Sequence, residues 1–145
     1  MSTSISTTVA DAIKDSLNAQ VFVPAATAVR AYQPVFDLAT VGDSLRLSVI
    51  PRGVLVSASS RSACFFDVST DIGVQKKIDP NDPTVIDSLL GLVEQIGDHL
   101  RLKRLATYTD AQWLSSEHEP ILAAEHLERQ SVFTSVLTVT HRVTR

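Results

Sequence analysis

Apolar residues near the N-terminus recur at four-residue spacing, as Val9, Ile13 and Leu17 do, with charged and polar residues between them. This spacing predicts a helix with one apolar face. Thr8 suits the N-cap, because its hydroxyl would accept from the amide of Asp11 while the Asp11 carboxylate sits at the positive end of the helix dipole. One face of this helix must therefore pack against the rest of the chain.

Two-residue alternation predicts strands through the middle of the chain. A short strand around Val29 ends at Gln33–Pro34, and a clearer strand covers residues 45–50. We expect residues 51–53, Pro-Arg-Gly, to turn the chain before extended structure resumes at Val54.

The polar run Ser57–Ser62 predicts a mobile connection into the next strand. That strand carries the longest alternation, from Phe66 to Val74, with polar residues on its opposite face. It is therefore predicted to be half exposed.

A wide apolar stripe from Val85 to Leu100 predicts the main helix of the core, with Asp82 as its N-cap and Pro83 at its first position. Three further elements are predicted: a short extended piece at Trp113–Leu114, one or two helical turns over Ala124–Arg129, and a long strand over Phe133–Val143.

This order of elements predicts an α+β fold: a single mixed, largely antiparallel β-sheet with two main helices packed on one face. The 145 residues, 44% of them hydrophobic, suffice for one domain covering residues 1–145. A domain of this size buries about 70% of the surface that its unfolded chain exposes, so stability requires no metal or disulfide. We accordingly expect no cofactor.

The charge balance is 13 Lys and Arg against 16 Asp and Glu, a net charge of -3, which disfavours a surface that grips nucleic acid. The single cysteine, Cys64, is interpreted as a buried structural thiol in a reducing compartment. The N-terminal residues lack a signal-peptide pattern, and no apolar run reaches the length of a membrane span. These features predict a soluble cytoplasmic product that binds no membrane.

The residues that carry chemistry assemble no recognisable active site. The five glycines are scattered singly, and neither a Gly-x-Ser-x-Gly elbow nor a His-Glu-x-x-His pair occurs. His118, Glu119 and His126 offer metal-ligand chemistry, although their spacing matches no known site and solvated loop charges explain them more simply. We therefore expect no enzymatic activity.

Other polar residues have structural explanations. Arg101, Lys103 and Arg104 place positive charge at the C-terminal end of the long helix, where it complements the helix dipole. His99 lies near the same end, so a helix-dipole role or simple exposure accounts for it. His141 alternates with the apolar residues of the last strand, which predicts a packed, hydrogen-bonded side chain.

The segments Leu45–Arg52, Asp67–Ile78 and Phe133–Val143, together with the helix Val85–Leu100, resemble the tail terminator proteins of long-tailed bacteriophages. The resemblance extends from the first helix to the last strand, and Trp113 with the Glu119–Pro120 stretch adds to it.

The resemblance implies a subunit that forms a ring, usually of six, at the head-proximal end of the tail tube. One ring face would cap the tube and stop its polymerisation, while the other would present a surface to the head connector. The implied partners are a second copy of the chain, the tail tube protein and the head connector protein. DNA would pass through the ring without specific binding, and the protein, assembled in the host cytoplasm, would reside in the virion.

The resemblance assigns no interface residues, so the candidates follow from position alone. Arg52 and Arg61 flank the predicted polar connection, and Lys76 and Lys77 lie at a strand end, where long cations reach a partner subunit. The lysines also suit a second role, the protection of a strand end from unwanted pairing.

Three alternative functions remain open at this point. They are another head–tail connector or tail completion protein of the same virion, a small metal-dependent hydrolase that uses His118, Glu119 and His126, and a monomeric domain that binds a small ligand.

Overall fold

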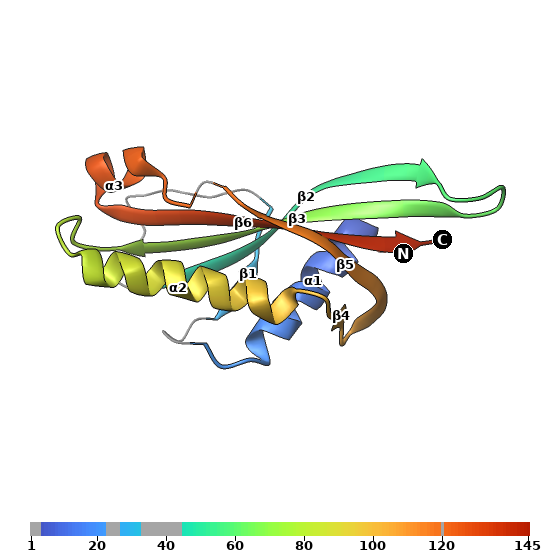
Figure 1. Cartoon of the computed structure of the whole chain (residues 1–145), viewed down its shortest axis with the longest axis horizontal. Coiled ribbons are helices and arrows are strands. Elements are labelled where there is room, and N and C mark those ends of the chain that lie inside the picture. The colour runs from blue at the N-terminus through green and yellow to red at the C-terminus, as the bar shows by residue number, and fades with distance from the viewer. Residues whose placement is uncertain (1–3, 23–26, 33–44, 120) are drawn as a thin grey trace.

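A computed structural model describes residues 4–22, 27–32, 45–119 and 121–145 of the chain. Its strands form one six-stranded sheet in the order β1-β2-β3-β6-β5-β4 (Figure 1). The elements in chain order are α1 (Ile5–Asn18), β1 (Ala28–Arg30), β2 (Arg46–Ala58), β3 (Cys64–Lys77), α2 (Pro83–Leu100), β4 (Arg104–Leu105), β5 (Tyr108–His118), α3 (Ala124–Gln130) and β6 (Val132–Thr144).

The sheet is mixed and largely antiparallel, as predicted. β1 runs parallel to β2, whereas β3 pairs antiparallel with both β2 and β6, and β5 pairs antiparallel with β6 and with β4. The helices α1 and α2 cover one face of this sheet, and α3 lies on the opposite side at one end (Figure 1). The predicted fold class, α+β with two main helices on one face, is confirmed.

The first helix begins four residues before its predicted start. Ser4, and not Thr8, is the N-cap: its hydroxyl accepts from the amide of Thr7 at 3.2 Å. Thr8 lies inside the helix and donates from its own hydroxyl to the Ser4 carbonyl oxygen at 2.9 Å. The extra turn forms because Ile5 packs against the core, a tertiary contact that outweighs the weak helix propensity of the Ser-Thr-Thr run.

The predicted turn at Pro51–Arg52–Gly53 is wrong. β2 continues through these residues, and its pairing with β3 shifts register between Pro51 and Gly53, which is a β-bulge. Proline has no backbone N–H to donate to a neighbouring strand, and a bulge interrupts the regular hydrogen bonding, so proline is tolerated there inside a strand. β2 and β3 therefore form one long hairpin, and its loop is shorter than the predicted Ser57–Ser62 connection, because Ser57 and Ala58 still pair with β3.

The centre of the sheet is buried where β3 and β6 pair. On the helix side, Val68, Ile72 and Val139 have no exposed surface and pack under α1 and α2. On the opposite side, Gln75 and Thr134 are also buried and hydrogen-bond to each other at 3.2 Å. The predicted half-exposed strand is thus half exposed only over its first part, from Cys64 to Asp71.

α2 matches its prediction at both ends. The Asp82 carboxylate accepts from the Thr84 amide at 3.1 Å, Pro83 occupies the first turn, and the helix ends at Leu100. Leu89, Leu92 and Ile96 are buried against the sheet. This helix forms one wall of the groove described below.

The segment around Trp113 is longer than predicted. β5 extends over eleven residues, and a register shift between Trp113 and Ser115 changes which side chains face the helices. That shift hides the alternation in the sequence. The predicted turns at Ala124–Arg129 and the C-terminal strand are confirmed as α3 and β6.

Candidate functional site

The sheet face away from α1 and α2 carries paired charges. Arg142 donates from Nε and Nη2 to the two carboxylate oxygens of Asp67, at 2.8 and 3.0 Å. This bidentate pair holds the pKa of Asp67 below its usual range and raises that of Arg142. The guanidinium also lies over the ring of Phe65, 4.1 Å from its centroid. This face, called the open face below, therefore carries charged side chains here, but the pair has no net charge.

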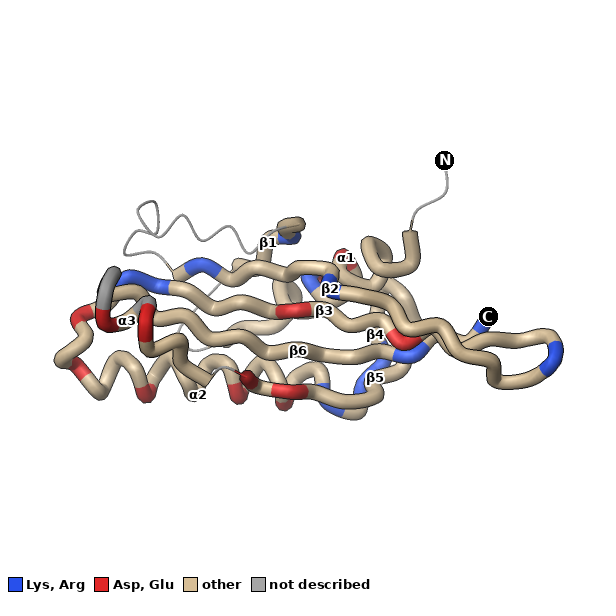
Figure 2. The backbone as a smooth tube through the Cα atoms, turned by 90° about the horizontal axis from the view of Figure 1, so that it is seen from above, with Lys and Arg blue, Asp and Glu red and all other residues tan. Residues whose placement is uncertain are grey.

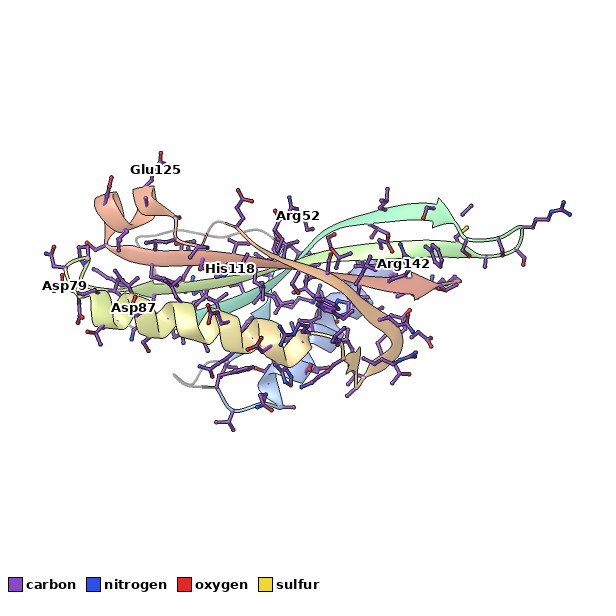
Figure 3. The ribbon with its side chains drawn as sticks, in the orientation of Figure 1. Arg52, Asp79, Asp87, His118, Glu125 and Arg142 are labelled. Atoms are coloured by element: carbon purple, nitrogen blue, oxygen red, sulfur yellow. The ribbon has the colours of Figure 1, made fainter. Side chains whose placement is uncertain are left out.

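Arg52 lies on the same face (Figure 3). Its Nη1 is 3.2 Å from the Thr138 hydroxyl and 3.6 Å from a carboxylate oxygen of Asp71, and Thr138 in turn donates to Asp71 at 2.7 Å. The Arg52 side chain remains 59% exposed. Arg52 thus stands on the strand at the bulge, and the expectation that it flanks the hairpin loop is corrected.

The other three candidate residues lie in a loop and at a strand end. Arg61 is exposed in the loop between β2 and β3, and this hairpin reaches one end of the molecule (Figure 2). Lys76 and Lys77 end β3, where they pair with Phe133 and Val132 of β6. The two lysines therefore lie far from Arg61, at the other end of the same strand, and no single patch contains all four candidates.

The β2–β3 hairpin exposes apolar side chains. Val54, Leu55 and Val56 are 40%, 67% and 53% exposed. β1 pairs with β2 only from Leu47 to Val49, so within the described part of the chain no strand borders the edge of β2 away from β3 from Ile50 onward. An unpaired edge with apolar side chains is the feature that natural proteins normally cover.

A second unpaired edge lies at the other side of the sheet. β4 pairs with β5 only at Tyr108 and Gln112, and the described residues place no strand on the edge of β5 away from β6 between Trp113 and His118. Between this edge and α2 lies an open groove, lined by Val93, Glu94, Gly97, Asp98, Arg101, Trp113, Ser116, His118 and Leu137. The sequence patterns gave no sign of this groove, because it forms between two elements that lie apart in the chain.

His118 is part of the groove wall. Its Nε2 is hydrogen-bonded to the Ser135 hydroxyl at 2.6 Å, and burial lowers its pKa, although Glu94 opposes that effect. Ser135 itself is fully buried, so its hydroxyl is out of reach of a substrate. The pair therefore fixes the end of β5 to β6.

The remaining histidines have structural positions. His99 is half buried between the two helices and hydrogen-bonds the Ser16 hydroxyl at 3.0 Å; burial and the nearby Lys103 lower its pKa. His141 is fully buried, and neither of its ring nitrogens has a hydrogen-bond partner among the described residues. The prediction of a packed His141 is confirmed, and that of a hydrogen-bonded one is wrong.

Two further expectations concern metals and the thiol. The described residues contain no group of three His, Cys, Asp or Glu side chains that suits a metal ion, and the side chain of His126 lies outside that description. Cys64 is partly exposed at the start of β3, so its predicted burial is wrong. No helix in the described ranges is both long and apolar enough to span a bilayer.

Comparison with known proteins yields a structural match. No protein-family model and no curated protein sequence matches the chain. A solved structure described as the virion of a native gene transfer agent particle contains a chain similar to this one, with a TM-score of 0.60 and 17% identity, over 99% of this chain and 100% of that chain. The two chains share a fold. At this identity the match establishes the fold alone.

Proposed function

We propose that this protein is a structural subunit of a phage-like virion. It forms a ring of six copies that caps the head-proximal end of the tail tube, stops tube polymerisation and offers its other face to the head connector. The resemblance of its strand and helix segments to tail terminators supports this role, and so does the end-to-end fold match with a chain of a gene transfer agent virion. In this role the protein acts by shape and contact, without catalysis.

The observation that carries the proposal is the pair of half-open sheet edges. β2 runs antiparallel to β3, β3 to β6 and β6 to β5, so β2 and β5 run in opposite directions. If the sheet continued from one copy to the next, the free part of β5 would meet the free part of β2 as an antiparallel pair. The partner of each copy in this ring is thus a second copy of the same chain.

Such a contact is heterologous, because two different edges meet. A heterologous contact closes into a ring when the rotation between copies permits, and it leaves the two faces of the ring different. One face then binds the last ring of tail tube protein, while the other face presents no copy of that tube surface. Termination of the tube follows from this difference between the faces.

The open sheet face suits a channel for DNA. Two of its arginines are paired, Arg142 with Asp67 and Arg52 with Asp71, and Ser69 and Thr140 place hydroxyls between them. Cations that carboxylates already neutralise release few counterions from DNA and bind it weakly. DNA would therefore pass without specific binding.

A tube-end binding experiment tests the proposal. Tail tubes purified without a terminator are incubated with the protein and examined by electron microscopy, and the lengths of tubes grown with and without it are compared. We expect density at one tube end and arrest of growth. Binding to the head connector without binding to tube ends would instead support the alternative connector role, and binding to neither would refute both.

A further inference from the structure

The groove between α2 and β5 combines apolar and charged side chains. Val93, Trp113 and Leu137 give it an apolar part beside Glu94, Asp98 and Arg101. The Trp113 indole N–H is already satisfied by the Ser116 hydroxyl at 2.8 Å. The ring therefore presents apolar surface without leaving a donor unpaired on burial.

The β2–β3 hairpin carries apolar side chains on the matching side. Val54 pairs with Val68 and Val56 with Phe66, which places both valines on the side of the sheet that α1 and α2 cover elsewhere. Leu55 pairs with Asp67 on the open face. The two valines remain 40% and 53% exposed.

We propose that the groove between α2 and β5 receives Val54 and Val56 from the hairpin of a second copy. Side chains alternate between the two faces of a sheet. If β2 of a second copy pairs with β5 so that the helices of both copies cover the same face, the even-numbered hairpin residues, Val54 and Val56, lie on the side of the groove. Trp113, Ser116 and His118 point to that same side, because they pair with His141, Val139 and Leu137 of the helix-covered face. This inference rests on the proposed ring and names its contact.

Charge supports a second copy as the occupant. β2 and its loop, from Arg46 to Ala63, contain three arginines and no carboxylate. The groove and β5 contain Glu94, Asp98, Asp110 and Glu117, with Arg101 as the one lysine or arginine. Opposite charges thus meet when a hairpin enters the groove, whereas two hairpins or two grooves would repel each other.

Disulfide cross-linking of the full-length chain tests the contact. In a background of Cys64→Ser, Ser116→Cys is combined with Val54→Cys, Leu55→Cys or Val56→Cys, and each protein is oxidised at a concentration where sedimentation shows self-association. A disulfide needs Cα atoms about 4.4–6.8 Å apart with facing Cβ atoms. We expect Val54→Cys or Val56→Cys to give covalent multimers at least tenfold more abundantly than Leu55→Cys, which points to the other face. The single-cysteine variants are the controls for random collision.

The outcomes separate this inference from the proposed function. Cross-links at position 55 equal to those at 54 and 56, or none at any position in a self-associated protein, would overturn the groove contact while leaving the ring role intact. A chain that stays monomeric up to about 1 mM would also overturn it. The tube-end experiment judges the ring role independently, because it requires only binding to tubes.

Discussion

At the scale of single residues, His141 should make the protein sensitive to acid. Burial lowers its pKa to about 4, from 6.5 in an unfolded chain. Between these values the unfolded chain binds a proton that the folded chain excludes, so stability is complete above pH 6.5 and falls as the pH drops toward 4. The loss from this residue is roughly 3 kcal/mol at most, since one pKa unit corresponds to about 1.4 kcal/mol.

The substitution His141→Leu should flatten this dependence. Neither ring nitrogen has a partner among the described residues, so an apolar side chain of similar volume breaks no hydrogen bond there. We expect urea unfolding of the variant to show a smaller loss of stability between pH 7 and pH 4.5 than the parent shows. His99 and His118, whose pKa values are also lowered, leave a residual slope in both proteins. An unchanged slope would exclude His141 as the main cause.

Arg52 is the interface candidate whose surroundings permit a clean test. It is 59% exposed and its ion pair with Asp71 measures 3.6 Å, a geometry that contributes little to stability. Arg52→Glu should therefore lower the melting temperature by no more than about 5 °C, yet impair ring formation and with it binding to tail tube ends, because Arg52 lies on the part of β2 whose free edge makes the proposed ring contact. The charge-matched control is Lys14→Glu on α1, which should bind normally. Normal tube-end binding by Arg52→Glu would remove Arg52 from the interface.

At the scale of elements, sequence patterns predicted those that form locally. α2 was predicted to its ends because an N-cap, a proline and a regular apolar stripe agree, and β6 because its alternation is unbroken. The predictions for β2 and β5 are wrong because each strand contains a bulge. In β2 the bulge accommodates Pro51 within the strand, although proline there predicts a turn; in β5 the bulge interrupts the alternation of apolar and polar residues. Pairing with neighbouring strands, not local preference, sustains both strands.

The N-cap of α2 offers a prediction at this scale. Asp82→Ala removes the carboxylate that accepts from the Thr84 amide, so we expect a loss of about 1 kcal/mol in the free energy of unfolding. Asp87→Ala, on the exposed side of the same helix, should change it by less than about 0.5 kcal/mol. Denaturant unfolding of both variants beside the parent provides the comparison. Equal effects would mean that Asp82 acts only through its charge.

At the scale of the whole molecule, the candidate site could not be predicted from sequence. The chain reveals which strands exist, but the free edges depend on how far β1 and β4 extend along their neighbours, and the groove depends on how α2 crosses β5. The exposed Val54-Leu55-Val56 run is a signal that the sequence does carry, because three consecutive apolar residues in a strand with one solvent-facing side place at least one of them on that side. Of the four residues chosen from sequence, Arg52 and Arg61 lie on this hairpin.

A heterologous contact predicts that two different defects complement each other. Val56→Glu puts a carboxylate on the cationic β2 hairpin and leaves the β5 edge intact, whereas Ser116→Lys puts a cation into the acidic groove and leaves the hairpin intact. Each variant alone should self-associate at least tenfold more weakly than the parent. Mixed in equal amounts, they retain one good pair of edges, the Ser116→Lys hairpin in the Val56→Glu groove. Sedimentation should therefore show a one-to-one heterodimer and nothing larger. An isologous contact between two β2 edges would behave differently: Ser116→Lys would then self-associate like the parent, and mixing would rescue nothing.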